Sequence, residues 1–513
     1  MAHATTITSS EPSAEPNRAM IVASVMLAAF MPLLDTTVAN VVLPQMQGSL
    51  SATRETISWV LTSYIVASAV MMPMVAWAAA RVGRRRLFLG AIVIFTIASM
   101  LCGLAANLGQ MIVFRLLQGA SGAILVPLSQ AIILDAYPRE RHGQMMAIWG
   151  AGIMIGPILG PTLGGWLADA ADWRWVFYIN LPVGILAFLS TSTFLEKDKP
   201  NPRRFDLAGF IYLVIGIGSL QLMLDRGELK DWFHSYEILI EAAVAASGLW
   251  MFAVHAMTMR TSLIDLRIFL DRNYAIGSVM ALVLGLVLVA VAALLPTMMQ
   301  TLLNYPTLTS GILIAPRGVG TMLAMIIAGR TLHLVDARSY ATFGLLLISL
   351  SLYQMTKFDL YMDTWPLIYS GFIQGIGMGL SYAALTTISF STLAPEMRAD
   401  GAAISSLMRN LGSSIGVSLL IALLSRNTQI NHAEIAESIS AGVLQSDAGM
   451  IERNLALGFS SAAELLNAEL TRQALMISYL NNFKLMMFIT LAAAPLAYLM
   501  DRPAIAKAEF AAE

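Results

Sequence analysis

Two ionisable residues lie inside stretches that are otherwise almost wholly apolar. Asp35 falls within "AMIVASVMLAAFMPLLDTTVANVVLP", and Arg115 falls within "MIVFRLLQGASGAILVPLSQAIIL". A charged side chain in a bilayer is costly, so such residues generally face the interior of a helix bundle, pair with one another and serve a function. We therefore expect Asp35 and Arg115 to pair.

An Asp–Arg pair in hydrocarbon is suited to handling protons. The guanidinium favours the ionised carboxylate and burial favours the neutral acid, and a ligand or a conformational change can alter either influence. Asp35 and Arg115 are therefore the candidate proton-coupling residues, with a proton as the coupling ion and no other cofactor. The alternative is a purely structural ion pair. We favour coupling because an apolar contact would join two helices without the desolvation cost.

The composition is that of an integral membrane protein. Of the 513 residues, 57% are hydrophobic and only 12% are charged, whereas soluble proteins carry about 25% charged residues. The 37 glycines suit closely packed membrane helices. The net charge of −1 gives no sign of nucleic-acid binding. A single cysteine, Cys102, leaves no internal disulfide framework.

A bilayer-crossing helix needs roughly 20 largely apolar residues. Applied along the chain, that length predicts an all-α integral membrane protein. It gives fourteen spans, near 20–42, 56–79, 87–105, 110–134, 143–168, 176–195, 205–224, 236–256, 273–300, 309–331, 339–356, 364–390, 400–425 and 482–500.

Basic residues gather in alternate short loops, such as those that hold Arg84, Arg139 and Lys197. Loops rich in Lys and Arg stay in the cytoplasm, so this bias predicts cytoplasmic termini, in agreement with an even number of spans. The polar residues 1–19 and 501–513 are then cytoplasmic tails. Residues 427–481 form a long outer loop, in which "AELLNAELTRQALMISYL" has helical periodicity.

The segment "WGAGIMIGPILGPTLGGWL" places four glycines on one helix face at intervals of four residues. Such a face lets another helix approach closely, and each proline removes a backbone hydrogen bond and loosens the helix. This pattern predicts a hinge or sliding contact; the alternative is a static, tightly packed interface. Together with the basic loop "RVGRRRLF", it supplies the candidate conformational residues: Arg81, Gly83, Arg84, Gly152, Gly156, Pro157, Gly160, Pro161, Gly164 and Gly165.

These motifs together resemble those of a known transporter family. "RVGRRR", "RLLQG" and "GPILGPTLGG" look like the signatures of the major facilitator superfamily. "LDTTVANVVLP" and "WRWVFYINLP" resemble its fourteen-span drug:proton antiporters of the EmrB/QacA type, and "RNLGSSIGVS" is particularly like the EmrB branch of Gram-negative bacteria. The resemblance covers residues 20–500.

The resemblance implies a major facilitator fold of two six-helix bundles, 20–195 and 273–500, with two inserted helices in the linker 196–272. It implies proton-driven export of hydrophobic or amphipathic compounds from a bacterial inner membrane. It also implies a periplasmic adaptor (EmrA-like) and an outer-membrane channel (TolC-like), for which the loop 427–481 is a candidate contact. An exporter of one physiological compound, such as a fatty acid, bile salt or siderophore, is the alternative.

One departure from the family pattern concerns the basic loop. The motif usually begins with Gly and has Asp before its first Arg, but these positions are Ala76 and Ala80 here. The Asp–Arg relay proposed for that loop therefore cannot operate as described. Arg81, Gly83 and Arg84 remain, so a lock at a helix terminus or by packing is still open.

A polyspecific substrate cavity should be apolar and adaptable, with a few polar groups. Any single candidate residue has the alternative role of simple packing or a helix–helix hydrogen bond. The candidates are Asn40, Gln118, Gln130, Trp149 and Met154 in the N-terminal half, with Gln300, Gln374, Tyr382 and Arg409 in the C-terminal half.

Other classes of membrane protein are less well supported. The six His are scattered without metal-ligand or haem-ligand spacing, and no nucleophile–base arrangement or phosphate-binding Gly loop is present. An enzyme, a metal protein and an ATP-driven pump are therefore disfavoured. A facilitator-fold sensor or lipid scaffold is a further alternative, against which Asp35 and Arg115 argue.

Overall fold

The computed structural model describes residues 18–53, 56–138, 141–196, 198, 205–259, 263–332, 334–438 and 459–502. Every regular element in these ranges is a helix. The predicted tails 1–19 and 501–513, and the middle of the predicted outer loop, lie mostly outside the described residues.

The N-terminal half contains six spans, one of them continued through a short 3-10 turn and two divided into two helices each. Its helices are α1 (Arg18–Ser49), α2 (Trp59–Met71) with η1 (Met72–Met74) and α3 (Val75–Val82), α4 (Arg84–Leu104), α5 (Leu108–Ala136), α6 (His142–Ile153) with α7 (Ile155–Ala170), and α8 (Trp175–Tyr178) with α9 (Asn180–Phe194).

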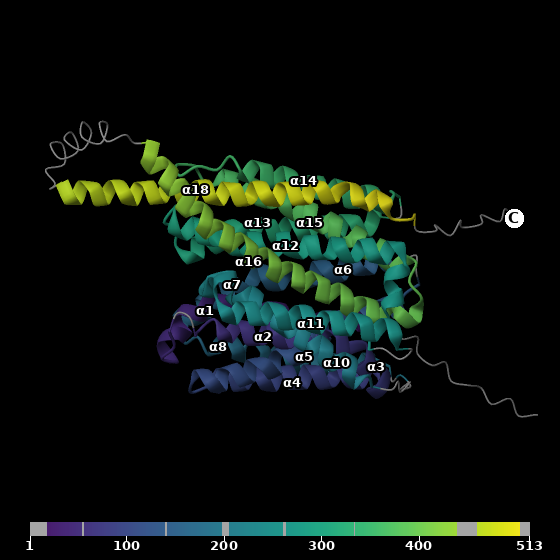
Figure 1. Cartoon of the computed structure of the whole chain (residues 1–513). Helices are drawn as coiled ribbons and strands as arrows, with labels where there is room; N and C mark the ends of the chain where they lie inside the picture. The colour runs from purple at the N-terminus through teal and green to yellow at the C-terminus, as the bar shows by residue number, and fades with distance from the viewer. Residues whose placement is uncertain are drawn as a thin grey trace, which may run out of the picture.

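The remaining helices form the inserted pair and the C-terminal half. The inserted helices are α10 (Leu207–Arg226) and α11 (Tyr236–Thr258). The C-terminal half holds α12 (Arg272–Thr301), α13 (Thr307–Thr331), α14 (Ala337–Met355), α15 (Trp365–Ser391), α16 (Arg398–Ser438) and α18 (Phe459–Ala493). The helices of the two halves run side by side, with α6 and α7 near the boundary between them (Figure 1).

Twelve of the described helices are long and apolar enough to cross a membrane. Ten of them match predicted spans to within a few residues. The last two, Asp400–Glu437 and Glu464–Leu499, contain the predicted spans 400–425 and 482–500 but are longer by one to two dozen residues. The other two predicted spans, 339–356 and 364–390, correspond to α14 and α15, whose polar side chains bond within the bundle: Ser351 donates to the Ser370 carbonyl at 2.7 Å, and Ser381 to that of Ala341 at 3.3 Å. The total of fourteen spans stays a prediction.

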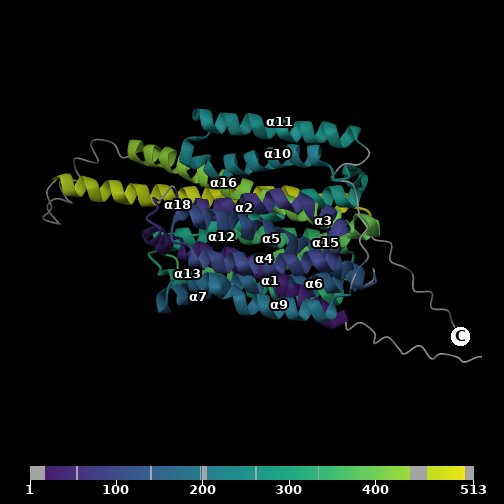
Figure 2. The same ribbon diagram turned by 90° about the horizontal axis from the view of Figure 1, so that it is seen from below.

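The inserted helix α10 lies against both halves. It runs along α2, where Gly218 comes close to Val70 and the Thr62 hydroxyl donates to the Asp225 carboxylate. Gln221 donates through Nε2 to Ser414 Oγ of α16 at 2.7 Å. Figure 2 shows α10 and α11 on one flank of the molecule, next to α2 and α16.

The predicted outer loop 427–481 is helical in its described part. α16 runs without interruption to Ser438, and α18 begins at Phe459, so both spans continue past the bundle (Figure 1). Asn431 Nδ2 donates to Ser478 Oγ at 2.9 Å, and His432 lies 3.0 Å from Asn467 Oδ1. The segment is thus a projecting helix pair rather than a loop, apart from 439–458, which lie outside the described residues.

The fifth span is interrupted between α6 and α7, just before Pro157. α6 ends at Ile153 and α7 begins at Ile155, because Pro157 has no N–H to donate to the carbonyl four residues earlier. The glycine face packs on α1. A Cβ at Gly160 would clash with Thr37 Oγ1, and one at Gly156 would lie 3.1 Å from Leu34 N. Glycine at position 160 therefore allows α1 to come this close.

Candidate functional site

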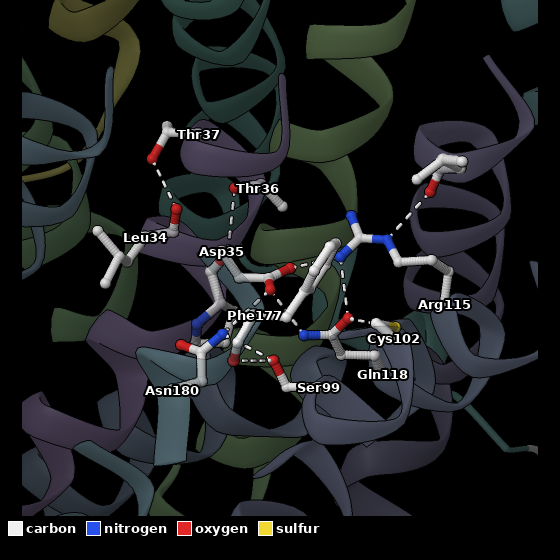
Figure 3. Close-up of polar contacts among 12 residues, drawn as sticks. Leu34, Asp35, Thr36, Thr37, Ser99, Cys102, Arg115, Gln118, Phe177 and Asn180 are labelled. Carbon is white, nitrogen blue, oxygen red and sulfur yellow. Dashed lines mark hydrogen bonds and ion pairs between the residues drawn. The ribbon is translucent and has the colours of Figure 1, made fainter. Parts of the chain in front are cut away.

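Asp35 of α1 and Arg115 of α5 form an ion pair in the core of the N-terminal half. Arg115 Nη1 lies 2.6 Å from Asp35 Oδ2, and the residues are 0% and 2% exposed. Figure 3 shows the two side chains pointing toward one another. The predicted pairing is therefore present in the structure, while the proton-coupling role stays a prediction.

Two amide side chains also donate hydrogen bonds to the Asp35 carboxylate. Gln118 Nε2 and Asn180 Nδ2 donate to Asp35 Oδ1 at 2.7 and 3.1 Å. With Arg115, the carboxylate thus accepts from three donors (Figure 3), and this compensates an ionised group for lost hydration. Gln118, predicted to line the substrate cavity, belongs to this cluster instead, because its Oε1 also accepts from Arg115 Nη1 at 2.9 Å.

Arg115 is held by neighbours from a third helix. Its Nε donates to the Val60 carbonyl of α2 at 3.0 Å, and its guanidinium lies 4.4 Å from the centre of the Tyr64 ring. One nitrogen, Nη2, has no hydrogen-bond partner among the described residues. The arginine therefore keeps part of its hydrogen-bonding capacity unused beside the carboxylate.

Sequence analysis did not assign Asn180, Ser99 or Tyr64 to this site. Asn180 lies in the motif "WRWVFYINLP", which the sequence analysis used only for the family resemblance. In the structure its amide bridges Asp35 and Ser99 Oγ, the latter at 2.9 Å, and Ser99 donates to the Phe177 carbonyl at 2.8 Å. The position of this polar asparagine inside an otherwise largely apolar span was the one available signal.

The basic loop forms a second cluster, at one end of the bundle. Gly83 has φ +94°, a backbone conformation that favours glycine, and it lets the chain pass from α3 to α4 beside Asp198. The Asp198 carboxylate accepts from Arg84 N at 2.6 Å. Arg81 is exposed, with its guanidinium 6.0 Å from the Trp77 ring.

The Arg84 side chain pairs with Asp135 at the end of α5. Asp135 Oδ1 also lies 3.1 Å from Nη1 of Arg398, at the start of α16, and the same nitrogen donates to the Leu134 carbonyl at 3.1 Å. The loop position before Arg81 is Ala80, and the carboxylate beside Arg84 is that of Asp135 in α5. The resulting Arg–Asp–Arg cluster joins the two halves.

Three of the predicted cavity residues come together where the halves meet. Tyr382 of α15 accepts through its hydroxyl from Gln130 Nε2 of α5 at 3.1 Å and from Arg409 Nη1 of α16 at 2.8 Å. A small cavity lies beside Tyr382 and Arg409.

The other cavity candidates do not join this group. Trp149 is fully buried, and its Nε1 donates to Ser129 Oγ at 3.0 Å within the N-terminal half. Gln374 is fully buried in the C-terminal half. Met154 is half-buried at the α6–α7 break, and Asn40 and Gln300 are exposed. The residue types alone did not show whether these side chains face the predicted cavity, the core of one half or the surface.

Within the described residues, no group of three or more His, Cys, Asp or Glu side chains could hold a metal ion. A multi-pass helical bundle with a buried ion pair and with a polar cluster between its halves is an arrangement typical of membrane transporters.

The family model of the Major Facilitator Superfamily matches residues 25–417, and the chain belongs to this family of transporters. The chain is 35% identical to the multidrug export protein EmrB of Escherichia coli (strain K12) over 457 residues, with 88% of this chain and 89% of that protein covered. It is 34% identical to the fatty acid resistance protein FarB of Neisseria gonorrhoeae, with 90% and 91% covered.

Solved structures show the same fold at low sequence identity. The proton:xylose symporter XylE superposes with a TM-score of 0.60 at 13% identity, covering 92% of this chain and 94% of that one. The human organic anion transporter MFSD10 also gives 0.60 at 13% identity, covering 93% and 100%. The protein is therefore a multi-pass membrane protein of the major facilitator fold.

Proposed function

We propose that this chain is a proton-driven efflux permease that exports hydrophobic or amphipathic compounds by alternating access. The observation that carries this proposal is the fully buried Asp35–Arg115 pair, in a chain that resembles a multidrug export protein along most of its length. The proton is the only coupling species required, and no catalytic chemistry is invoked.

The transport cycle turns on the charge of Asp35. The ionised carboxylate satisfies Arg115, Gln118 and Asn180. A proton taken up from the outer side removes that charge and leaves Arg115 as an uncompensated buried cation, which is costly. The ion-pair cluster must then rearrange, and α1 moves with it.

The glycine face gives that movement a route to the boundary between the halves. Gly156 of α7 packs on Leu34, the residue before Asp35. The same span continues into α6, where Gly150 packs on Met325 of α13 in the C-terminal half. A shift of α1 therefore changes the contact between the halves, and the proton leaves to the cytoplasm as the next substrate enters.

The chain is proposed to lie in a bacterial inner membrane with both termini in the cytoplasm. It would work with an EmrA-like periplasmic adaptor and a TolC-like outer-membrane channel. The helix pair formed by the ends of α16 and α18 supports this, because it projects past the bundle at the end that the basic loops assign to the periplasm.

A narrower function is the second candidate. The similarity to a fatty acid resistance protein, at nearly the same identity as to EmrB, favours an exporter of one physiological amphiphile. Comparing transport of several unrelated lipophilic compounds with transport of fatty acids separates the two functions.

The test of proton coupling is reconstitution into proteoliposomes under an imposed pH gradient. Addition of a transported lipophilic compound should trigger proton movement, and Asp35→Asn should abolish it. Asp172→Asn, which changes an exposed loop carboxylate, is the matched control and should retain it. An Asp35→Asn protein that still pumped at full rate against a gradient would exclude the proposed mechanism.

A further inference from the structure

The hydroxyl of Tyr382 is saturated as an acceptor but has a proton to donate. A tyrosine hydroxyl offers one donor and two acceptor sites. Gln130 Nε2 and Arg409 Nη1 fill both acceptor sites, and no acceptor for the hydroxyl proton lies among the described residues. The group therefore has hydrogen-bonding capacity left for an acceptor that is not part of the chain.

Arg409 is an intramembrane cation without a counter-charge. It forms no ion pair in the described part of the chain; its side chain donates to Tyr382 and, at 3.3 Å, to Ser406 Oγ. Its guanidinium lies 5.5 Å from the centre of the Tyr382 ring. Arginine stays charged in proteins, and a charge at membrane depth generally has a partner. Arg115, by contrast, has Asp35.

The cavity beside these donors has both polar and apolar walls. Its polar lining residues are Tyr382, Arg409, Ser405, Thr386 and Ser389, and its apolar ones include Leu284, Leu385 and Phe390. Its volume is about 20 Å³, which is room for about one water molecule. A substrate therefore cannot occupy it in this conformation.

The N-terminal half contacts this site through Gln130, which occupies one of the acceptor positions on Tyr382. Among the described residues, the cavity itself is lined by α12, α15 and α16 of the C-terminal half. Separation of the halves would break the Gln130 bond and uncover the Tyr382 hydroxyl on the side of the N-terminal half.

We propose that Arg409 and Tyr382 bind the anionic headgroup of the transported compound, so that amphiphiles carrying a carboxylate are preferred over neutral or cationic ones. The guanidinium supplies the charge and paired N–H donors that match a carboxylate, the Tyr382 hydroxyl supplies a further donor, and the apolar wall takes the hydrocarbon body. This inference rests on the proposed export function and specifies its substrate class.

Equilibrium binding in detergent tests the site without requiring proton coupling. The probes are a radiolabelled medium-chain fatty acid and its methyl ester, which share a hydrocarbon body and differ in charge. Arg409→Gln should weaken binding of the fatty acid by about tenfold, which corresponds to about 1.4 kcal/mol, and change ester binding by less than about twofold. Arg409→Lys should restore part of the difference between the two probes.

Tyr382→Phe keeps the ring and removes only the hydroxyl, so it serves as a second variant that is independent of folding defects in Arg409→Gln. It should weaken fatty-acid binding by a few-fold and spare the ester. Equal losses for both probes, or an unchanged fatty-acid affinity in both variants, would overturn the anion site. Loss of coupled transport with intact selective binding would instead overturn only the export mechanism.

Discussion

Arg398 Nη1 lies 3.1 Å from Asp135 Oδ1, and this contact joins the start of α16 to the end of α5. Arg398 is 7% exposed, so its charge is largely removed from water and depends on Asp135 and the Leu134 carbonyl. The two halves are therefore fastened to each other at the end of the bundle that holds the basic loop.

Asp135→Asn should loosen that end of the bundle. The amide cannot compensate Arg84 and Arg398, so conformations in which the halves separate there should become more populated. A cysteine pair, Gln144→Cys with Gly329→Cys, reports closure, because a Cβ at Gly329 would lie 3.6 Å from Gln144 Cα across the boundary. We expect disulfide formation to slow several-fold in Asp135→Asn. An unchanged rate would show that the ion pairs do not hold the closed state.

The glycine face makes a sharply controlled prediction. Gly160→Leu should clash with Thr37, whereas nothing lies within 4 Å of a Cβ at Gly165. Overpacking of this kind costs about 1–3 kcal/mol. Gly160→Leu should lower the melting temperature in detergent and abolish transport, while Gly165→Leu should leave both nearly unchanged. Equal behaviour of the two variants would contradict the packing of α1 on this span.

Asn180 should matter for the charge cluster despite carrying no charge. Asn180→Ala removes one of three donors to the Asp35 carboxylate and leaves Ser99 Oγ without that partner. Loss of a buried hydrogen bond costs about 1–3 kcal/mol, so coupled transport in proteoliposomes should fall by about tenfold or more. Asn180→Gln tests whether an amide alone suffices, and full activity in the alanine variant would remove Asn180 from the site.

Asp336, in the loop before α14, gives a prediction for pH. Hydrogen bonds and charge from Arg338 hold the pKa of the Asp336 carboxyl below its ordinary value. The carboxylate therefore adds stability that is present above the unfolded pKa and is lost as pH falls through the folded one. Asp336→Asn should melt lower than the natural chain at pH 7, and the gap should close below about pH 4. If the difference in melting temperature between the two proteins persisted in acid, the Asp336–Arg338 ion pair would not be the cause of that difference.

The projecting helix pair can be tested separately from transport. Ile430 and Leu465 are 44% and 54% exposed on its described part. If this pair receives an EmrA-like adaptor, Ile430→Glu with Leu465→Glu should reduce adaptor co-purification and leave transport in proteoliposomes intact. Unimpaired co-purification would contradict an adaptor contact at this helix pair and would favour α11 as the adaptor-binding element.

The ion pair was predictable because Asp35 and Arg115 are conspicuous in apolar spans. Its amide partners were not, since spans contain many Asn, Gln and Ser, and only the three-dimensional fold brings Gln118, Asn180 and Ser99 to one carboxylate. Asp135 was missed for a related reason: its partner Arg398 lies in the other half of the sequence. Helix positions followed from hydropathy, whereas the helical continuation of α16 into a polar segment did not.

The inserted helix α10 affects how a membrane-dissolved compound can reach the interior. The boundary between the halves has two long edges, and α10 covers the one where α2 faces α16, through Asp225 and Gln221. For an exporter of lipid-borne compounds, we expect α10 to exclude substrate along this edge. Entry from the bilayer would then require the opposite edge to open, where α6 meets α13 and Gly150 packs on Met325.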